Sequence, residues 1–130
     1  MSEKFPSSEK LKSKILIDAL FTEGKSIKNF PIKLVYLPIK DLPVTSFKTG
    51  FSVPKRNFKH AVDRNLLKRL MREAFRKNKY LVESNFQDKY AFMFIYTGRK
   101  KIAYSEITTC IKKLLETFIE RHSTHENFHT

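Results

Sequence analysis

The residues best suited to chemistry in this 130-residue chain are a dense run of cations between Lys55 and Lys79. The run holds ten Lys or Arg side chains against two acids, Asp63 and Glu73, and so carries +8 of the formal net charge of +13. Such side chains bind phosphate through charge-assisted hydrogen bonds and by releasing the counterions of a polyanion. A solvated surface is the usual role of an isolated basic pair, but like charges at this density repel one another. The run therefore favours a nucleic acid as the partner.

A long amphipathic helix is the element that would bring these cations together. At 100° per residue, the polar side chains share an arc of about 140°. They are Arg64, Asn65, Lys68, Arg69, Arg72, Arg76 and Lys79. The rest of the wheel is apolar, through Leu66, Leu67, Leu70, Met71, Ala74, Phe75 and Leu81. Such a stripe is typical of a helix that packs on a sheet, so we expect one face to pack and the other to bind.

The remaining elements are predicted from periodicity and from chain breakers. A first helix is expected from about residue 8 to Gly24, followed by strands over 32–38 and 45–53 that each end at a proline. A buried strand is expected over 90–97, and then a last helix capped near Ser105. The pattern indicates a single-domain α+β sandwich over 9–121, with a flexible leader at 1–8 and a flexible tail at 122–130.

Bulk properties indicate a cytosolic protein. The length fits one domain, and the single cysteine, Cys110, excludes an internal disulfide framework. The first ten residues are polar and contain no signal-like apolar stretch, and the longest uncharged apolar run, 90–96, is too short to cross a bilayer. Binding of the basic helix to anionic lipid is a remote alternative.

No set of residues suits catalysis or metal binding by the protein itself. His122, His125 and His129 could be read as metal ligands, but a polar tail explains them better. The acids are scattered, and three glycines are too few for a phosphate loop. We therefore predict no catalytic residue and no metal ligand, so that any reaction would be carried out by groups from a partner.

Aromatic side chains are a second feature that suits RNA. Phe21, Tyr36 and Phe51 could stack unpaired bases if they face a groove. The alternative is that all three belong to the core.

The basic segment resembles the protein subunit of bacterial ribonuclease P, whose signature is an Arg-Asn-Arg element within a longer basic run. Here the run reads FSVPKR from Phe51, AV from Ala61, RNLLKR from Arg64 and REAFR from Arg72. The resemblance extends over about residues 9–120. Leu66 occupies the second arginine of the signature, and Ile17 stands where the family often has an aromatic residue.

The resemblance implies an α-β-β-β-α-β-α order with a left-handed βαβ crossover, as in domain 2 of ribosomal protein S5. It also implies a role in removing the 5′ leader from precursor tRNA, with Mg2+ held mainly by a catalytic RNA subunit and none bound tightly by the protein. The expected partners are that RNA and precursor tRNA, with neither a membrane nor an obligate protein partner. The implied catalytic-RNA contacts are Lys55, Arg56, Lys59, His60, Arg64, Asn65, Lys68, Arg69, Arg72 and Arg76. The implied leader contacts are Phe21, Tyr36, Phe51 and Ser52.

Three alternatives remain at this point. A ribosomal protein or general RNA chaperone would carry a similar basic face. A nuclease acting alone would cut without an RNA subunit. A DNA-binding regulator would need a helix that reads base edges, whereas these cations suit phosphates better.

Overall fold

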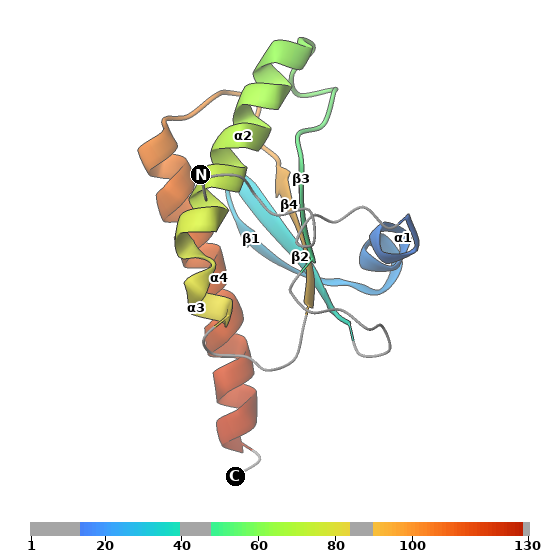
Figure 1. Cartoon of the computed structure of the whole chain (residues 1–130), viewed down its shortest axis with the longest axis vertical. Coiled ribbons are helices and arrows are strands. Elements are labelled where there is room, and N and C mark those ends of the chain that lie inside the picture. The colour runs from blue at the N-terminus through green and yellow to red at the C-terminus, as the bar shows by residue number, and fades with distance from the viewer. Residues whose placement is uncertain (1–13, 40–47, 84–89, 129–130) are drawn as a thin grey trace, which may run out of the picture.

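A sheet with the strand order β1-β2-β4-β3 lies at the centre of the molecule (Figure 1). The computed structural model describes residues 14–39, 48–83 and 90–128, with side chains of the last helix described as far as Arg121. The strands are β1 (Lys25–Asn29), β2 (Ile32–Pro38), β3 (Lys48–Ser52) and β4 (Tyr90–Tyr96), and the helices are α1 (Lys14–Glu23), α2 (Ala61–Asn78), α3 (Tyr80–Glu83) and α4 (Tyr104–Phe128). The α-β-β-β-α-β-α order is confirmed, with α3 as a short addition.

The sheet mixes antiparallel and parallel pairing. β2 is antiparallel to both β1 and β4, whereas β3 is parallel to β4. The long helix α2 lies in the chain between these two parallel strands, so β3, α2 and β4 form the expected βαβ unit. As an edge strand, β3 presents one side to β4 and leaves the other side unpaired within the described sheet.

Helices cover both faces of the sheet, and this adds a partial third layer to the expected two-layer sandwich (Figure 1). The larger core lies on the face covered by α2 and α4, where Phe75, Phe92 and Phe118 are each at most 2% exposed. On the other face, α1 packs Leu16 and Leu20 against Val35 and Met93. Strand alternation decides which face each side chain joins.

Helix α2 packs as its pattern predicts. Leu67, Met71, Ala74 and Phe75 are buried, and the cations lie on the other side. Asn78 is also buried, which the pattern does not predict, and its Nδ2 donates to the Ala74 carbonyl oxygen at 2.8 Å. This local bond satisfies an amide that would otherwise be costly to bury.

Both ends of α4 differ from the prediction. Its first bonds run from the amides of Glu106 and Ile107 to the Ala103 carbonyl oxygen, and Glu106 Oε2 accepts a bond from the Ala103 amide, so Ala103 is the N-cap in place of Ser105. The helix continues to Phe128, where a tail was expected from His122. No glycine or proline interrupts 104–128, so the backbone has no local reason to stop earlier. The expected leader, the start of the first helix and the first three residues of the strand expected over 45–53 lie outside the described residues.

Candidate nucleic-acid interface

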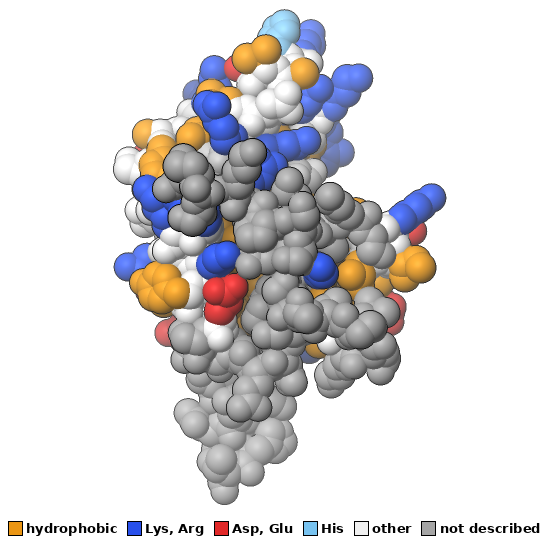
Figure 2. Space-filling model, in the orientation of Figure 1, with side chains coloured by type: hydrophobic (Ala, Val, Ile, Leu, Met, Phe, Trp, Pro, Cys, Tyr) orange, Lys and Arg blue, Asp and Glu red, His pale blue; other side chains and the backbone are white. Residues whose placement is uncertain are grey.

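A cationic ridge lies along the solvent side of α2. We use this name for Arg64, Asn65, Lys68, Arg69, Arg72 and Arg76. Asn65 and Arg69 are exposed, and the other four are half-buried. Figure 2 shows Lys and Arg side chains gathered over this part of the molecule, with few acids between them. The predicted separation of a packing face from a basic face is confirmed.

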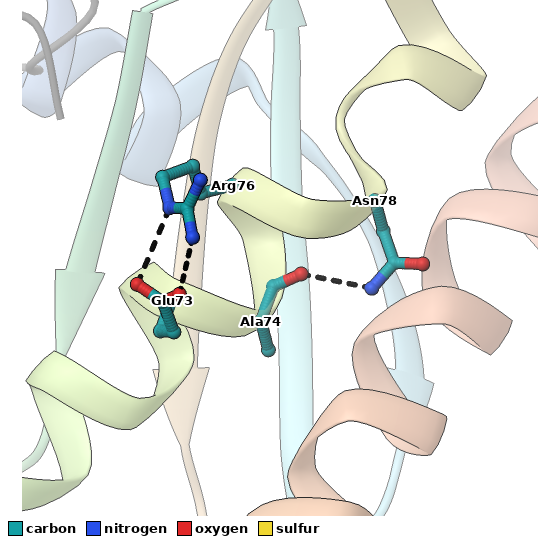
Figure 3. A network of polar contacts seen from close by, with 4 residues as sticks. All are labelled: Glu73, Ala74, Arg76 and Asn78. Carbon is teal, nitrogen blue, oxygen red and sulfur yellow. Dashed lines mark hydrogen bonds and ion pairs between the residues drawn. The ribbon is translucent and has the colours of Figure 1, made fainter. Parts of the chain in front are cut away.

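The two acids of the basic segment are both paired. Asp63 Oδ1 accepts a bond from Lys101 Nζ at 3.0 Å. Glu73 pairs with Arg76, whose Nε lies 3.3 Å from Oε2 and whose Nη2 bonds Oε1 (Figure 3). The hydrogen bond from Arg76 lowers the pKa of the Glu73 carboxyl. Arg76 is therefore partly neutralised, and the uncompensated charge of the ridge lies toward its Arg64 end.

Arg64 also organises the loop that precedes the helix. Its Nη1 donates to the carbonyl oxygens of Phe58 at 2.7 Å and Lys59 at 2.8 Å. Phe58 is buried against Tyr96, so these bonds fix the loop to the core. His60 is the N-cap of α2, and its side chain makes no capping bond. Lys55, Arg56, Lys59 and His60 are all exposed around this helix start.

A cleft of about 600 Å³ lies at the end of the sheet, on the face that carries α1. Phe21 of α1, which is 58% exposed, and Ser52 of β3 line this cleft, and both were predicted as leader contacts. Lys33, Arg56 and Arg99 supply its cations, and the remaining lining residues are Pro54, Asn57, Ile95 and Thr97. Asn57 holds the wall in place, because its Nδ2 donates to the Thr97 carbonyl oxygen at 3.4 Å.

The lining of the cleft does not include Tyr36, which was predicted as a leader contact. Tyr36 is 5% exposed and packs edge-on against Phe118, with ring centroids 4.9 Å apart. It shares strand parity with Ile32 and Leu34, which point toward α4 and away from α1. The residues of β2 on the α1 face are Lys33, Val35 and Leu37.

Phe51 is displaced from the predicted site for the same reason. It is half-buried on the α2 side of the sheet, stacked on Phe94 at 5.7 Å between centroids and edge-on to Phe75. The Arg72 guanidinium carbon lies 5.7 Å from the Phe51 ring centroid. Phe51 therefore supports the cationic ridge by a cation–π contact instead of lining the cleft.

Sequence reasoning missed two cleft cations, Lys33 and Arg99. Lys33 has the opposite strand parity to Tyr36, and Arg99 belongs to the basic turn that follows β4. The strand parity of Lys33 and the basic turn that contains Arg99 can both be read from the sequence. Arg56, expected at the catalytic RNA, also lines the cleft, so the loop 54–57 joins the cleft to the ridge.

The two departures from the family pattern, Leu66 and Ile17, lie on different helices. Leu66 is half-buried on α2. Ile17 is half-buried and packs against the smaller core cluster beneath α1. In the described ranges, no three His, Cys, Asp or Glu side chains are placed to share a metal ion. None of the helices described is long and apolar enough to span a membrane.

Comparison with known proteins gives a consistent result. The sequence model of a family described as Ribonuclease P matches residues 5–119. The chain is 36% identical over 88 residues to a ribonuclease P protein component of Porphyromonas gingivalis, which covers 68% of this chain and 64% of that protein, so the match spans somewhat less than two thirds of the relative. It is 32% identical over 112 residues to the component of Borrelia turicatae, covering 85% of this chain and 92% of that protein.

Solved structures show the same fold. The RNase P protein of Thermotoga maritima aligns with a TM-score of 0.68 at 22% identity, covering 84% of this chain and 96% of that one. That of Staphylococcus aureus aligns with a TM-score of 0.67 at 22% identity, covering 84% and 94%. The family match spans most of the sequence, so this chain belongs to the ribonuclease P protein component family.

Proposed function

We propose that this chain is the protein subunit of a ribonuclease P ribonucleoprotein that removes the 5′ leader from precursor tRNA in the cytoplasm. The cationic ridge binds the catalytic RNA subunit. The cleft holds the single-stranded leader of the substrate. The protein itself breaks no bond. It neutralises backbone charge and fixes the path of the leader.

The observation that carries this proposal is the pair of cationic surfaces joined by one loop. The ridge offers guanidinium and ammonium groups on a rigid helix, a form suited to the phosphates of a folded RNA. The start of α2 adds the positive end of the helix dipole, beside exposed Lys59 and His60. The cleft instead combines an exposed ring, Phe21, with three cations, which is the chemistry of single-stranded RNA binding. One RNA on each surface explains why both exist.

The side chains that line the cleft are not suitable ligands for Mg2+. Its ionisable lining is Lys33, Arg56 and Arg99, all cationic, whereas Mg2+ prefers carboxylate and phosphate oxygens. We therefore assign no step to a metal held by these residues. The proposed division of labour leaves Mg2+ with the RNA subunit, and the protein acts on the substrate by binding and orientation.

A general RNA-binding protein or chaperone is the second candidate, because a basic ridge alone would serve it. The cleft distinguishes the two functions. A chaperone has no need of a leader site, so it would bind precursor and mature tRNA equally.

Reconstitution with a bacterial ribonuclease P RNA tests the proposal. We expect the particle to cleave precursor tRNA at low Mg2+ and to bind precursor more tightly than mature tRNA, with the difference reduced by Phe21→Ala. Equal affinity for the two tRNAs would favour the chaperone. Cleavage by the protein without added RNA would refute the division of labour.

A further inference from the structure

A second hollow, of about 930 Å³, opens beside the cleft at the same end of the sheet. Its walls are the turn between β1 and β2, the turn after β4 and the first turns of α4. Phe30, Pro31, Ile102 and Cys110 supply apolar lining, and Arg99 and Lys100 supply charge. None of the functions assigned above uses this hollow.

Phe30 is the prominent feature of this hollow, because 79% of its surface is exposed. The turn that carries it is well anchored. Thr97 donates to the Pro31 carbonyl oxygen from its backbone amide at 2.7 Å and from Oγ1 at 3.1 Å. Gly98 lies beneath the turn, where a Cβ would approach Pro31 Cβ to 2.8 Å and Phe30 Cζ to 3.6 Å. An aromatic ring is thus exposed to solvent on a well-anchored turn, and it contributes little to the core of the fold.

The hollow and the cleft adjoin each other. Both are lined by Thr97 and Arg99. A smaller groove of about 180 Å³ lies between them, and its lining includes Phe30, Lys33 and Thr97. A chain lying in the cleft beside Phe21 can therefore pass over Thr97 and reach Phe30 around the end of the sheet.

The charge along this path is predominantly positive. Lys28, Arg99 and Lys100 are exposed on it. The one acid in the lining is Glu106, and its Oε2 already accepts a bond from the Ala103 amide at 3.2 Å. Cations spaced along a groove, with aromatic rings between them, match alternating phosphates and unstacked bases.

We infer that Phe30 and this hollow form an additional nucleotide subsite, in which Phe30 stacks a base of single-stranded RNA that has already passed through the cleft. This inference rests on the proposed function, because the RNA in question is the leader. The subsite would be occupied only by leaders long enough to extend beyond Phe21. Arg99, shared by both hollows, would contact the backbone between the two stacked bases.

Leader length provides the test. Precursor tRNAs with leaders lengthened stepwise between about 4 and about 16 nucleotides are titrated with the reconstituted holoenzyme. Phe30→Leu keeps an apolar side chain but removes the ring, and Phe30→Tyr keeps the ring. We expect Phe30→Leu to bind short leaders as the unmodified protein does and long leaders roughly 5- to 30-fold more weakly. Phe30→Tyr should bind both normally.

Photo-crosslinking from 5-iodouridine, placed at successive leader positions, gives an independent readout. Crosslinks to Phe30 should come from positions farther from the cleavage site than those that reach Phe21. Unchanged affinity of Phe30→Leu at every leader length would overturn the subsite, as would an equal loss for mature tRNA. If Phe21→Leu lowers leader-dependent affinity and Phe30→Leu does not, the proposed function stands and the subsite falls. If the unmodified holoenzyme gains nothing from any leader, both fail.

Discussion

Two aromatic residues that the sequence placed in one site should behave oppositely when truncated to alanine. Tyr36 is 5% exposed and packs between Phe118 and Tyr90, whereas Phe21 is 58% exposed at the cleft. Tyr36→Ala is therefore expected to lower the free energy of unfolding, and Phe21→Ala to weaken binding of the leader.

The magnitudes follow from burial. Truncation of a buried large aromatic residue costs about 3–5 kcal/mol, which is a large fraction of the roughly 5–15 kcal/mol that holds a domain together. Somewhat less than half of the Phe21 side chain is buried, so its loss should cost about 1 kcal/mol of stability. If Phe21 stacks a base, binding of precursor tRNA should weaken by about 1–3 kcal/mol.

Thermal unfolding monitored by circular dichroism, with affinity measured for precursor and mature tRNA, separates the two effects. The expected result is a large fall in Tm for Tyr36→Ala and a fall of only about 3–5 °C for Phe21→Ala, which should lose affinity for precursor tRNA alone. A stable Tyr36→Ala protein with impaired leader binding would refute the assignment of strand parity. Unfolding of Phe21→Ala would show that Phe21 is a core residue.

Three further predictions concern the basic segment. Lys68→Ala combined with Arg69→Ala should reduce the slope of log affinity for the catalytic RNA against log salt by about two, since two phosphate contacts are lost. Arg64→Ala should lower the free energy of unfolding by about 1–2 kcal/mol, measured by denaturant titration, because two carbonyl oxygens of the preceding loop lose their donor. Glu73→Gln should cost under about 0.5 kcal/mol at neutral pH, since the pair lies at the surface, with 23% of the Arg76 side chain and 37% of the Glu73 side chain exposed to solvent. Because Arg76 lowers the folded-state pKa of Glu73, this difference should vanish as the pH falls below that pKa.

Controls make these three results interpretable. Lys112→Ala with Lys113→Ala removes two exposed cations from α4, away from the ridge, and should leave the salt slope unchanged. An equal fall in slope for both double variants would mean that net charge, and not the ridge, determines affinity. Arg64→Lys keeps the charge but offers no guanidinium fork, so recovery of full stability by that variant would contradict the loop-anchoring role. A Glu73→Gln difference that persists at low pH would contradict an origin in the ion pair.

The parts of the fold that the sequence predicts well are those where one interaction dominates. The two faces of α2 follow directly from the positions of its cations and leucines, because charge and burial exclude each other there. β4 is predicted within one residue, since an uncharged run such as 90–96 has no stable place except inside the sheet. The N-terminal strand β1 is less evident, because its sequence KSIKN buries only Ile27.

The candidate site is harder to predict, because the packing of separate helices and strands against one another decides which residues line it. Aromatic character marks Phe21 and Tyr36 equally, and only the direction of β2 relative to α1 separates them. The same limit applies to Lys33, because its strand parity can be read from the sequence but its place in the cleft depends on which face of the sheet α1 covers. The N-cap of α4 shows a related limit. Ser105 was expected to cap the helix through its side chain, but Ala103 is the N-cap, and the Glu106 carboxylate accepts a bond from the Ala103 amide.

The edge strand β3 links the two proposed RNA surfaces, and this explains why its sequence passes directly into the basic loop. Phe51 points toward α2 and lies under Arg72, while its neighbour Ser52 points to the opposite face and lines the cleft. Successive side chains of a strand must alternate in this way. A shift of β3 by one residue against β4 would therefore remove the support of the ridge and expose a ring in the cleft at the same time. The stacking of Phe51 on Phe94 opposes such a shift, so a contact within the core also fixes the position of the cleft relative to the ridge.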